Sequence, residues 1–453
     1  MSASLPDAPA GVAAPRETPL RVHTVVLPAA ADLPERGDDL PAELPDVVRA
    51  SGSDGSAPLL EVRSPTSGER LLDVEDTTPE AVEDVVAAVA AVSRADWAWL
   101  SGEDRARHLF AVADVLAAHV RPLAVTAALG TGRPVAAGLS VDGPAAHAAA
   151  FSAAGWADKL AEAGARPRPG GGVVVVPTTW RTAAADALGA VVAGLATGCG
   201  VLLRPRPAAA AGAARLAALL QEAGLPPGLV ATAPGADAAT DARLWAHREL
   251  VAVRADGCAE DLRALALALA PAGVPLVGRT DGPAVHVVLA GADLAAVLPV
   301  LLAAVAGGAH EHPGGTRVLV ARGLADALVR RLTPAVRRLR VGDPLERATA
   351  VGPLPSPHLA LAAREAAGAP VPDGLPEQGW WSPPALVRVG RHSPWPPPGP
   401  VLGVRGVRSA ADVPAHLAGA GSVRVWGGEL GAEAPAPPEH RREALELLRA
   451  CRG

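Results

Sequence analysis

The residues best suited to chemistry lie in one glycine-flanked segment, Gly307 to Val318, which holds His310, Glu311 and His312. An imidazole can serve as a general base or as a metal ligand. Two histidines separated by one residue share a face on a strand and diverge on a helix. A zinc site needs three or four ligands, and His286 is the only further histidine nearby in sequence. The pattern therefore favours a solvated loop over a metal site, and we assign no metal ligand.

Sulfur chemistry would have to come from Cys199, Cys258 or Cys451. Three cysteines do not make a disulfide framework, so reduced thiols in a cytoplasm are expected. The chain does not open with a basic segment followed by an apolar core, so we predict no signal peptide. Apolar runs such as Leu294 to Ala306 are too short to span a membrane. These features together predict a soluble, cytoplasmic protein.

The composition argues against a polyanionic partner. Among 453 residues, 47 acids outnumber 41 Lys and Arg, which gives a net charge of −6, and the two signs are interspersed. Aromatic residues, on which bases would stack, make up only 2%. A hydrophobic content of 49% is ample for the cores of two or three domains. We therefore expect a globular protein that binds neither nucleic acid nor membranes.

The first half of the chain alternates between strand and helix patterns. Residues 1–57 are rich in Pro, Asp, Glu and Ser, so we expect a mostly disordered extension in which only Arg21 to Leu27 alternates like a strand. In residues 58–273, Thr77 to Ala81 should begin a helix, with a Thr cap and Pro in the first turn. Gly172 to Pro177 is a β-branched run typical of a parallel strand buried on both faces. Further helices are expected at Gly102 to His119, Ala183 to Ala196 and Ala208 to Ala223, with strands at Gly200 to Leu203, Leu229 to Thr232 and Leu250 to Val253.

Residues 274–405 repeat this alternation, which predicts a doubly wound α/β architecture. The expected elements are strands at Ala284 to Leu289, Arg317 to Val320 and Val401 to Val404, and helices at Asp293 to Ala306 and Leu324 to Leu339. The Pro-rich stretch 352–400 reads as loop. Residues 406–453 form a short terminal segment.

Several segments resemble landmarks of the aldehyde dehydrogenase superfamily, and they occur in that family's order. Together they cover residues 59 to about 430. The most specific are Leu339-Arg340-Val341-Gly342-Asp343-Pro344-Leu345-Glu346 and Val351-Gly352-Pro353-Leu354. The others are Ser64 to Glu69, Asp96 to Ser101, Gly155-Trp156-Ala157-Asp158-Lys159, Ala223 to Val230, Gly379 to Val387 and Gly399 to Leu402.

The resemblance implies a Rossmann-like, NAD(P)-binding-type domain over 58–273 and an α/β catalytic-type domain over 274–405. The family's oligomerisation arms are expected to be reduced or missing. The segment between Lys159 and Val173 is short for a protruding hairpin, and the chain ends soon after Trp426. Residues 406–453 would then be a truncated C-terminal segment.

By the same resemblance, the family's catalytic groups are replaced here. The family's active-site run is roughly Gly-Gln-x-Cys-x-Ala-Gly-Ser-Arg, and counting back five from Arg317 puts His312 at the nucleophile position. Arg181 stands at the position of the oxyanion-binding Asn, and Val277 at that of the general-base Glu. Aldehyde oxidation needs a thiolate, an oxyanion donor and a base. We therefore expect all three positions to be non-functional.

The positions that would hold the dinucleotide are also altered. The resemblance implies NAD or NADP, with Arg204, Trp180 and Gly257 as the cofactor-binding positions. Arg204 keeps a positive charge, and Arg206 could favour a 2′-phosphate. Prolines replace three residues that hold ribose in the family, namely Pro207, Pro396 and Pro398. Strong dinucleotide binding is therefore not expected.

Three functions remain open. The first is a pseudoenzyme with a structural or regulatory role, in partnership with an active aldehyde dehydrogenase paralogue. The second is an active oxidoreductase that uses rearranged residues. A third reading is a protein that binds a small molecule in the cleft between the two domains.

Overall fold

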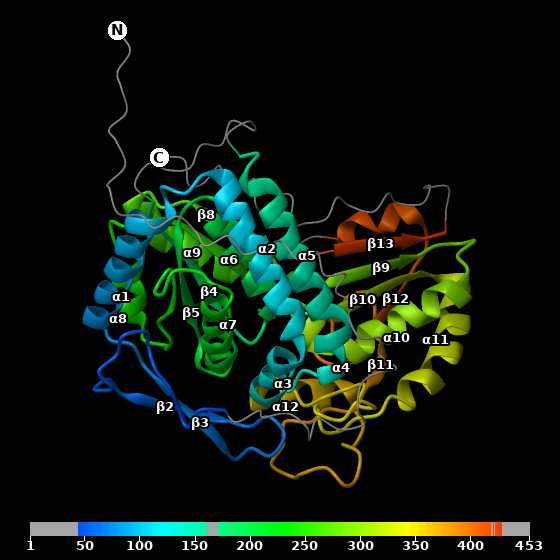
Figure 1. Ribbon diagram of the computed structural model, residues 1–453. Helices are drawn as coiled ribbons and strands as arrows, with labels where there is room; N and C mark the ends of the chain where they lie inside the picture. Colours follow the sequence, from blue (N-terminus) through cyan, green and yellow to red (C-terminus); the bar gives the residue numbers. More distant parts are fainter. Residues whose placement is uncertain (1–43, 161–170, 183, 418–419, 421, 428–453) are drawn as a thin grey trace.

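The architecture rests on two parallel five-stranded sheets and one small sheet (Figure 1). The computed structural model describes residues 44–160, 171–182, 184–417, 420 and 422–427. The expected strand at Arg21 to Leu27 lies outside these residues, as do most of the segment 160–172 and Cys451. The α/β fold class predicted from the sequence is confirmed.

The first large sheet has the order β6-β5-β4-β7-β8, and every pairing in it is parallel. Its central strand contains the β-branched run, and Val173 to Val176 are all buried. This is the pattern of a strand covered on both faces. The five strands are β4 (Val173–Thr178), β5 (Gly200–Pro205), β6 (Val230–Thr232), β7 (Leu250–Gly257) and β8 (Leu276–Thr280).

Helices cover both faces of this sheet. Because successive side chains on a strand point to opposite faces, Val173 and Val175 belong to one core, and Val174 and Val176 to the other. The first core includes α1 (Pro79–Val92), α8 (Ala238–Trp245) and α9 (Ala259–Leu269). The second includes α2 (Gly102–Ala118), α5 (Gly143–Ala157), α6 (Ala184–Ala196) and α7 (Ala210–Glu222), with α2 and α5 side by side in Figure 1.

The first helix begins as its sequence predicts. The Oγ1 atom of Thr78 accepts a hydrogen bond from the N–H of Ala81 at 3.2 Å, and Pro79 is the first helical residue. The side chains that face the sheet recur every three or four residues, at Val82, Val85, Val86 and Val89. A capped N-terminus and one apolar face together fix the position of α1.

The small sheet and three short helical segments complete this half. Strand β3 (Arg70–Glu75) pairs with β1 (Val47–Val48) in parallel and with β2 (Leu59–Arg63) in antiparallel orientation. Strand β1 falls within the 1–57 extension. After α2 the chain passes through α3 (Val120–Thr131), α4 (Val135–Ala137) and the π-helical turn η4 (Gly138–Asp142) before it enters α5.

The second large sheet has the order β11-β12-β10-β9-β13, again all parallel. Helices α10 (Leu294–Glu311) and α11 (Arg322–Arg337) pack on one of its faces. The edge strand β13 comes from the C-terminal segment and pairs with β9. The strands are β9 (Ala284–Val288), β10 (Thr316–Ala321), β11 (Ala385–Arg388), β12 (Val401–Val407) and β13 (Ser422–Trp426).

Two details differ from the sequence-based expectation. Strand β8 pairs with β7 in the first sheet, so the two sheets divide between Thr280 and Ala284, later than the 273/274 boundary. The stretch 352–400 is not all loop, because it contains β11 and the helix α12 (Pro357–Ala367). Ser356 caps α12 by accepting a hydrogen bond from the N–H of Leu359 at 3.2 Å, and Pro357 occupies its first turn.

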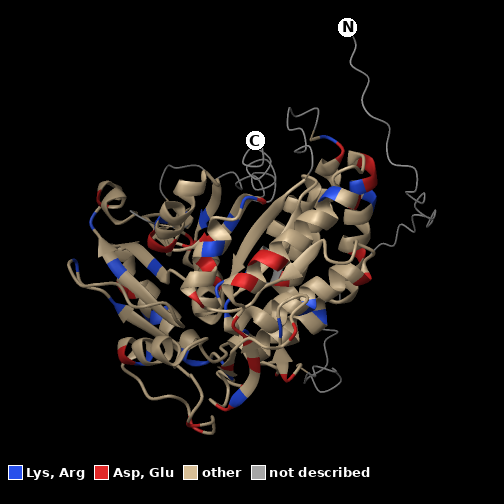
Figure 2. Ribbon diagram, turned by 90° about the vertical axis from the view of Figure 1, so that its left-hand side faces the viewer, with Lys and Arg blue, Asp and Glu red and all other residues tan. Residues whose placement is uncertain are grey.

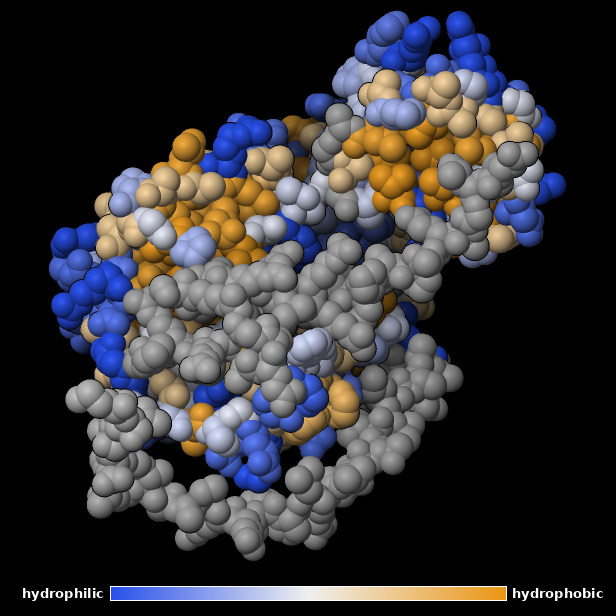
Figure 3. All heavy atoms as spheres, turned by 90° about the horizontal axis from the view of Figure 1, so that it is seen from above, coloured by the Kyte–Doolittle hydropathy of each residue, from blue (hydrophilic) through white to orange (hydrophobic). Residues whose placement is uncertain are grey.

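Charged and apolar residues are both spread over the surface. Lys and Arg are interspersed with Asp and Glu in Figure 2. Viewed from above, apolar atoms gather in two areas with hydrophilic atoms between them (Figure 3). In the described part, α10 alone passes as a membrane-spanning helix by length and composition, while α2 and α3 pass only as a pair bent by 65°. Helix α10 packs against β10, β12 and α11, as core helices do.

Candidate functional site

The histidine segment is a tight turn at the end of α10. Gly308 has φ 50° and ψ −135°, so the helix breaks there. A Cβ atom on Gly308 would lie 3.2 Å from backbone atoms of Gly399 and Pro400, and the left-handed φ favours glycine in any case. His312 closes the turn: its N–H donates to the carbonyl of Gly308 at 3.0 Å, and its own carbonyl accepts from Gly315 at 2.7 Å. The segment is thus fixed by its backbone rather than being a free loop.

Burial lowers the pKa of three imidazoles at this point. Burial lowers the pKa of His310 to about 4, and the charge of Arg133 lowers it further, against a hydrogen bond between Nε2 and the carbonyl of Pro353 at 3.1 Å. Burial also lowers the pKa of His286 to about 4, with smaller contributions from His312 and Arg424. The pKa of His312 is lowered by burial and then by Arg133.

The structure places His286 close enough to His312 for a charge on His312 to lower the pKa of His286. The sequence showed only that the two residues are near each other along the chain. The Nδ1 atom of His286 is buried and has no hydrogen-bond partner within the described residues. No group of three or more His, Cys, Asp or Glu side chains in the described part could hold a metal ion. The arrangement offers neutral proton acceptors in an apolar setting.

Arg133 is a member of this site that sequence reasoning missed. Its side chain is 8% exposed and forms a two-pronged ion pair with Asp142 at 2.6 and 2.8 Å, and it lies 3.7 Å from Glu311. Because it adds positive charge beside His310 and His312, it helps to keep both rings neutral. No motif around Arg133 indicates a role at this site. Its partner Asp142 lies in the π-helical turn η4, and the sequence did not predict that turn.

Arg181, which the resemblance places at the oxyanion position, is a paired arginine. The Nη1 atom of Arg181 lies 3.1 Å from Asp281 and 4.0 Å from Asp261, and the guanidinium sits 5.2 Å from the ring of Trp180. The turn that holds His312 adjoins this pair, because a Cβ on Gly314 would lie 2.5 Å from the backbone of Gly282. Since two carboxylates already compensate Arg181, it is a poor donor for a developing oxyanion.

The remaining catalytic positions carry no reactive group. Val277 is buried on β8 and belongs to the core formed with α2, α5 and α6. Cys199 is fully buried at the amino end of β5. Cys258 caps α9, and its Sγ accepts a hydrogen bond from the N–H of Asp261 at 3.4 Å. The structure therefore places neither of these thiols at the His312 position.

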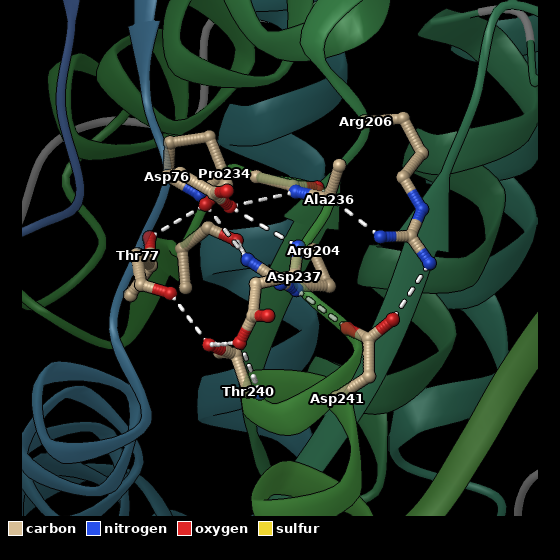
Figure 4. A network of polar contacts seen from close by, with 11 residues as sticks. Asp76, Thr77, Arg204, Arg206, Pro234, Ala236, Asp237, Thr240 and Asp241 are labelled. Carbon is tan, nitrogen blue, oxygen red and sulfur yellow. Dashed lines mark hydrogen bonds and ion pairs between the residues drawn. The ribbon is translucent and has the colours of Figure 1, made fainter. Parts of the chain in front are cut away.

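The position expected for the adenosine ribose is filled by the protein's own ion pairs. Arg204 ends β5 and is 1% exposed. Its Nε donates to Asp241 at 2.9 Å, and its Nη1 donates to the carbonyls of Ala233 and Pro234 at 3.0 and 2.7 Å (Figure 4). A guanidinium held in this way is turned inward and cannot reach a ligand outside the network.

Neighbouring residues close the same network. Arg206 donates to the second oxygen of Asp241 at 2.6 Å (Figure 4). Asp76 accepts hydrogen bonds from the N–H groups of Ala236 and Asp237 at 2.8 and 3.2 Å. These contacts join the ends of β5 and β6 to the start of α8, and Arg206, which is 41% exposed, is already ion-paired with Asp241.

The turn at Gly257, expected as a cofactor-binding position, is surrounded by acidic residues. Gly257 ends β7, and the first turn of α9 carries Glu260 and Asp261. The nearby cations Arg254 and Arg279 each lie 2.8 Å from Asp256. A helix N-terminus attracts phosphate through free N–H groups and positive charge, and here carboxylates stand in their place. The residues present do not fit a dinucleotide.

A small cavity lies beside the histidine turn. Its volume is about 60 Å³, and most of its walls are apolar side chains of α2, α3, α5, α6 and α7. Polar groups enter it from Arg133, His310, Trp180 and Thr182. Trp180, expected as a cofactor residue, thus lines this cavity.

Comparison with known proteins identifies the family. The aldehyde dehydrogenase family model matches residues 52–366. The chain therefore belongs to the aldehyde dehydrogenase family. Among solved structures it is similar to a putative aldehyde dehydrogenase from Burkholderia cenocepacia (TM-score 0.72, 25% identity, 87% of this chain and 86% of that one). An NAD-dependent aldehyde dehydrogenase from Sinorhizobium meliloti has a TM-score of 0.75 at 22% identity, over 90% and 86% of the two chains.

Curated relatives match over part of their length. The geranial dehydrogenase of Castellaniella defragrans is 32% identical over 289 residues, which are 60% of each chain. The betaine aldehyde dehydrogenase of Cereibacter sphaeroides is 28% identical over 316 residues, 67% of this chain and 64% of that protein. The match thus spans less than two thirds of these relatives.

Proposed function

We propose that this chain is a non-catalytic member of its family that neither oxidises aldehydes nor binds NAD(P) at the family's site. The observation that carries the proposal is the Arg204–Asp241–Arg206 network, which fills the expected ribose position with internal ion pairs. The loss of the thiol at His312 and of the carboxylate at Val277 points the same way. The relatives are named as dehydrogenases, and aldehyde oxidation needs a nucleophilic thiol and a general-base carboxylate. Neither His312 nor Val277 supplies such a group.

The direct test uses the purified full chain with NAD or NADP and a panel of aldehydes. We expect no absorbance change at 340 nm and no heat of dinucleotide binding by titration calorimetry. The variants Arg204→Ala and Asp241→Ala remove the ion pair that fills the expected ribose position. Dinucleotide binding that appears only in these variants would show a site that is present but closed. Saturable NAD binding by the unaltered chain, or turnover that His312→Ala abolishes, would establish an active oxidoreductase with rearranged residues instead.

In the cell, we infer a cytoplasmic structural or regulatory role alongside an active aldehyde dehydrogenase paralogue. Family membership supports an association with such a paralogue, because the two chains would share one fold. A chain that has lost catalysis can still offer the surfaces of that fold to a partner. Co-expression with a cysteine-bearing member from the same genome, followed by size-exclusion chromatography with light scattering, tests it. A mixed assembly of defined mass is expected. Two separate peaks at every mixing ratio would contradict the inference.

The cavity favours a second candidate function, binding of a small apolar molecule. A water needs about 10–15 Å³ of such space, and benzene enters apolar cavities of about 150 Å³. A cavity of about 60 Å³ therefore accommodates several waters or an apolar ligand smaller than benzene. Ala146 lies in the wall, so Ala146→Leu should fill the cavity. Xenon under pressure should raise the unfolding temperature of the unaltered chain and not that of Ala146→Leu. An equal rise in both would place any binding elsewhere.

A further inference from the structure

The second sheet carries one buried and one half-buried arginine, Arg405 and Arg317, on the face away from α10 and α11. Arg317 on β10 pairs in register with Gly403 on β12, and Arg405 is two residues further along β12. Residues two apart on a strand, and residues in register on neighbouring strands, point to the same face of a sheet. Arg317 and Arg405 therefore stand diagonally across from each other on one face.

A tryptophan connects the two arginines. The guanidinium carbon of Arg405 lies 4.2 Å from the centre of the Trp395 ring, and that of Arg317 lies 5.5 Å from it. Gly403 leaves room for this ring, because a Cβ there would lie 2.9 Å from the Cε3 atom of Trp395 and 2.8 Å from Pro396. The ring of Trp395 therefore lies against both guanidiniums.

Neither guanidinium has a carboxylate partner within the described residues. Burial lowers the pKa of Arg317, and the charge of Arg405 lowers it further. Burial alone lowers the pKa of Arg405, which is 6% exposed. Its Nη2 donates to the carbonyl of Ser393 at 2.6 Å, and its Nη1 lies 3.5 Å from Nδ1 of His416. Its Nε is buried without a hydrogen-bond partner.

Two like charges in a poorly hydrated position repel each other unless an anion compensates them. Two other buried arginines have such a compensation, since Arg133 pairs with Asp142 and Arg204 with Asp241. Arg105 is buried and donates only to the carbonyl of Leu100, but no second arginine is described beside it. Arg317 and Arg405 differ in that two guanidiniums share one aromatic ring. A planar guanidinium donates parallel hydrogen bonds to phosphate or carboxylate oxygens, which are the groups that would offset both charges.

We propose that Arg317, Arg405 and Trp395 form a binding site for the oxyanion of a small molecule, a phosphate or carboxylate group. The anion accepts hydrogen bonds from both guanidiniums, and Trp395 forms the wall beside it. The site is separate from the histidine turn, because His286 pairs in register with Val318 and so points to the opposite face of the sheet. It also does not depend on the proposed loss of catalysis.

The test is thermal unfolding of the full chain in sodium phosphate or sodium acetate, with sodium chloride at equal ionic strength as the reference. A ligand that binds only the folded state raises the unfolding temperature with its concentration. We expect such a rise with at least one of the two anions. In Arg317→Gln the dissociation constant should increase about tenfold or more, as loss of a charge-assisted hydrogen bond implies.

Arg424→Gln is the matched control. Arg424 lies on the same sheet, next to Trp426, but pairs in register with His286 and so occupies the opposite face. It should keep the full response to the anion. Because Arg405 is buried, Arg405→Gln would test folding as well as binding. The variants Arg317→Gln, at a half-buried residue, and Trp395→Leu therefore decide the test. An unchanged response in Arg317→Gln, or no response beyond that to chloride in the unaltered chain, would overturn the proposal.

Discussion

Removing the carboxylate of Asp241 should destabilise the protein strongly, because it strands a buried charge. Arg204 is 1% exposed, and Asp241 is its only ion-pair partner within the described residues. Breaking such a buried pair from one side costs about 3–5 kcal/mol, since the remaining ion can neither be hydrated nor compensated. Asp241→Ala should therefore lower the free energy of unfolding by about this amount. Arg206, at 41% exposed, stays hydrated and adds little to the loss.

Urea denaturation followed by far-ultraviolet circular dichroism measures the change. The double variant Arg204→Met/Asp241→Leu removes both charges and should recover most of the lost stability, because an apolar pair fills the same volume. Arg388→Ala is the control for an exposed pair, since Arg388 and Asp326 are both more than half exposed, and it should leave the midpoint nearly unchanged. The reasoning fails if Asp241→Ala costs no more than Arg388→Ala, or if the double variant is less stable than Asp241→Ala.

Acid should destabilise the protein through its buried histidines. His286 and His310 have folded-state pKa values of about 4, against 6.5 in the unfolded chain. Between these two pH values the unfolded state therefore binds more protons than the folded state. The stability present above pH 6.5 should fall by about 1.4 kcal/mol per pH unit for each group down to pH 4. The double variant His286→Gln/His310→Gln should flatten urea midpoints measured between pH 7 and 5, and an unchanged slope would refute this assignment. Gly308→Ala should cost about 1–3 kcal/mol because of its left-handed φ and close neighbours. Gly155→Ala, in α5 with no heavy atom within 4 Å of the added Cβ, should instead gain about 0.5–1 kcal/mol, and equal losses in the two variants would contradict the strain argument.

The sequence predicted the regular elements well where one local signal dominated. The Thr78 cap and the valine spacing placed α1, and the β-branched run placed β4. It missed α12 and β11, because the surrounding prolines read as loop and β11 is only four residues long. A short strand of this kind is specified by pairing with β12, which no local pattern reveals.

The candidate site depended more on contacts that are distant in sequence. The resemblance located His312, Arg181 and Val277, but not what surrounds them. Arg181 meets Asp281 across 100 positions, and Arg204 meets Asp241 across 37. Such pairs are set by how strands and helices pack, and sequence spacing carries no information about them. The closure of the ribose position therefore became visible only in the fold.

The last strand of the described chain affects how the protein is made. Strand β13 pairs with β9, although more than 130 residues separate them. During synthesis, Ala284 to Val288 leave the ribosome long before Ser422 to Trp426 are made. Until then the edge of β9 that pairs with β13 has unpaired N–H and C=O groups. The first sheet, complete by Thr280, can fold meanwhile, as N-terminal domains do. A nascent chain stalled before residue 422 would thus present an unpaired edge of β9 that can pair with another chain.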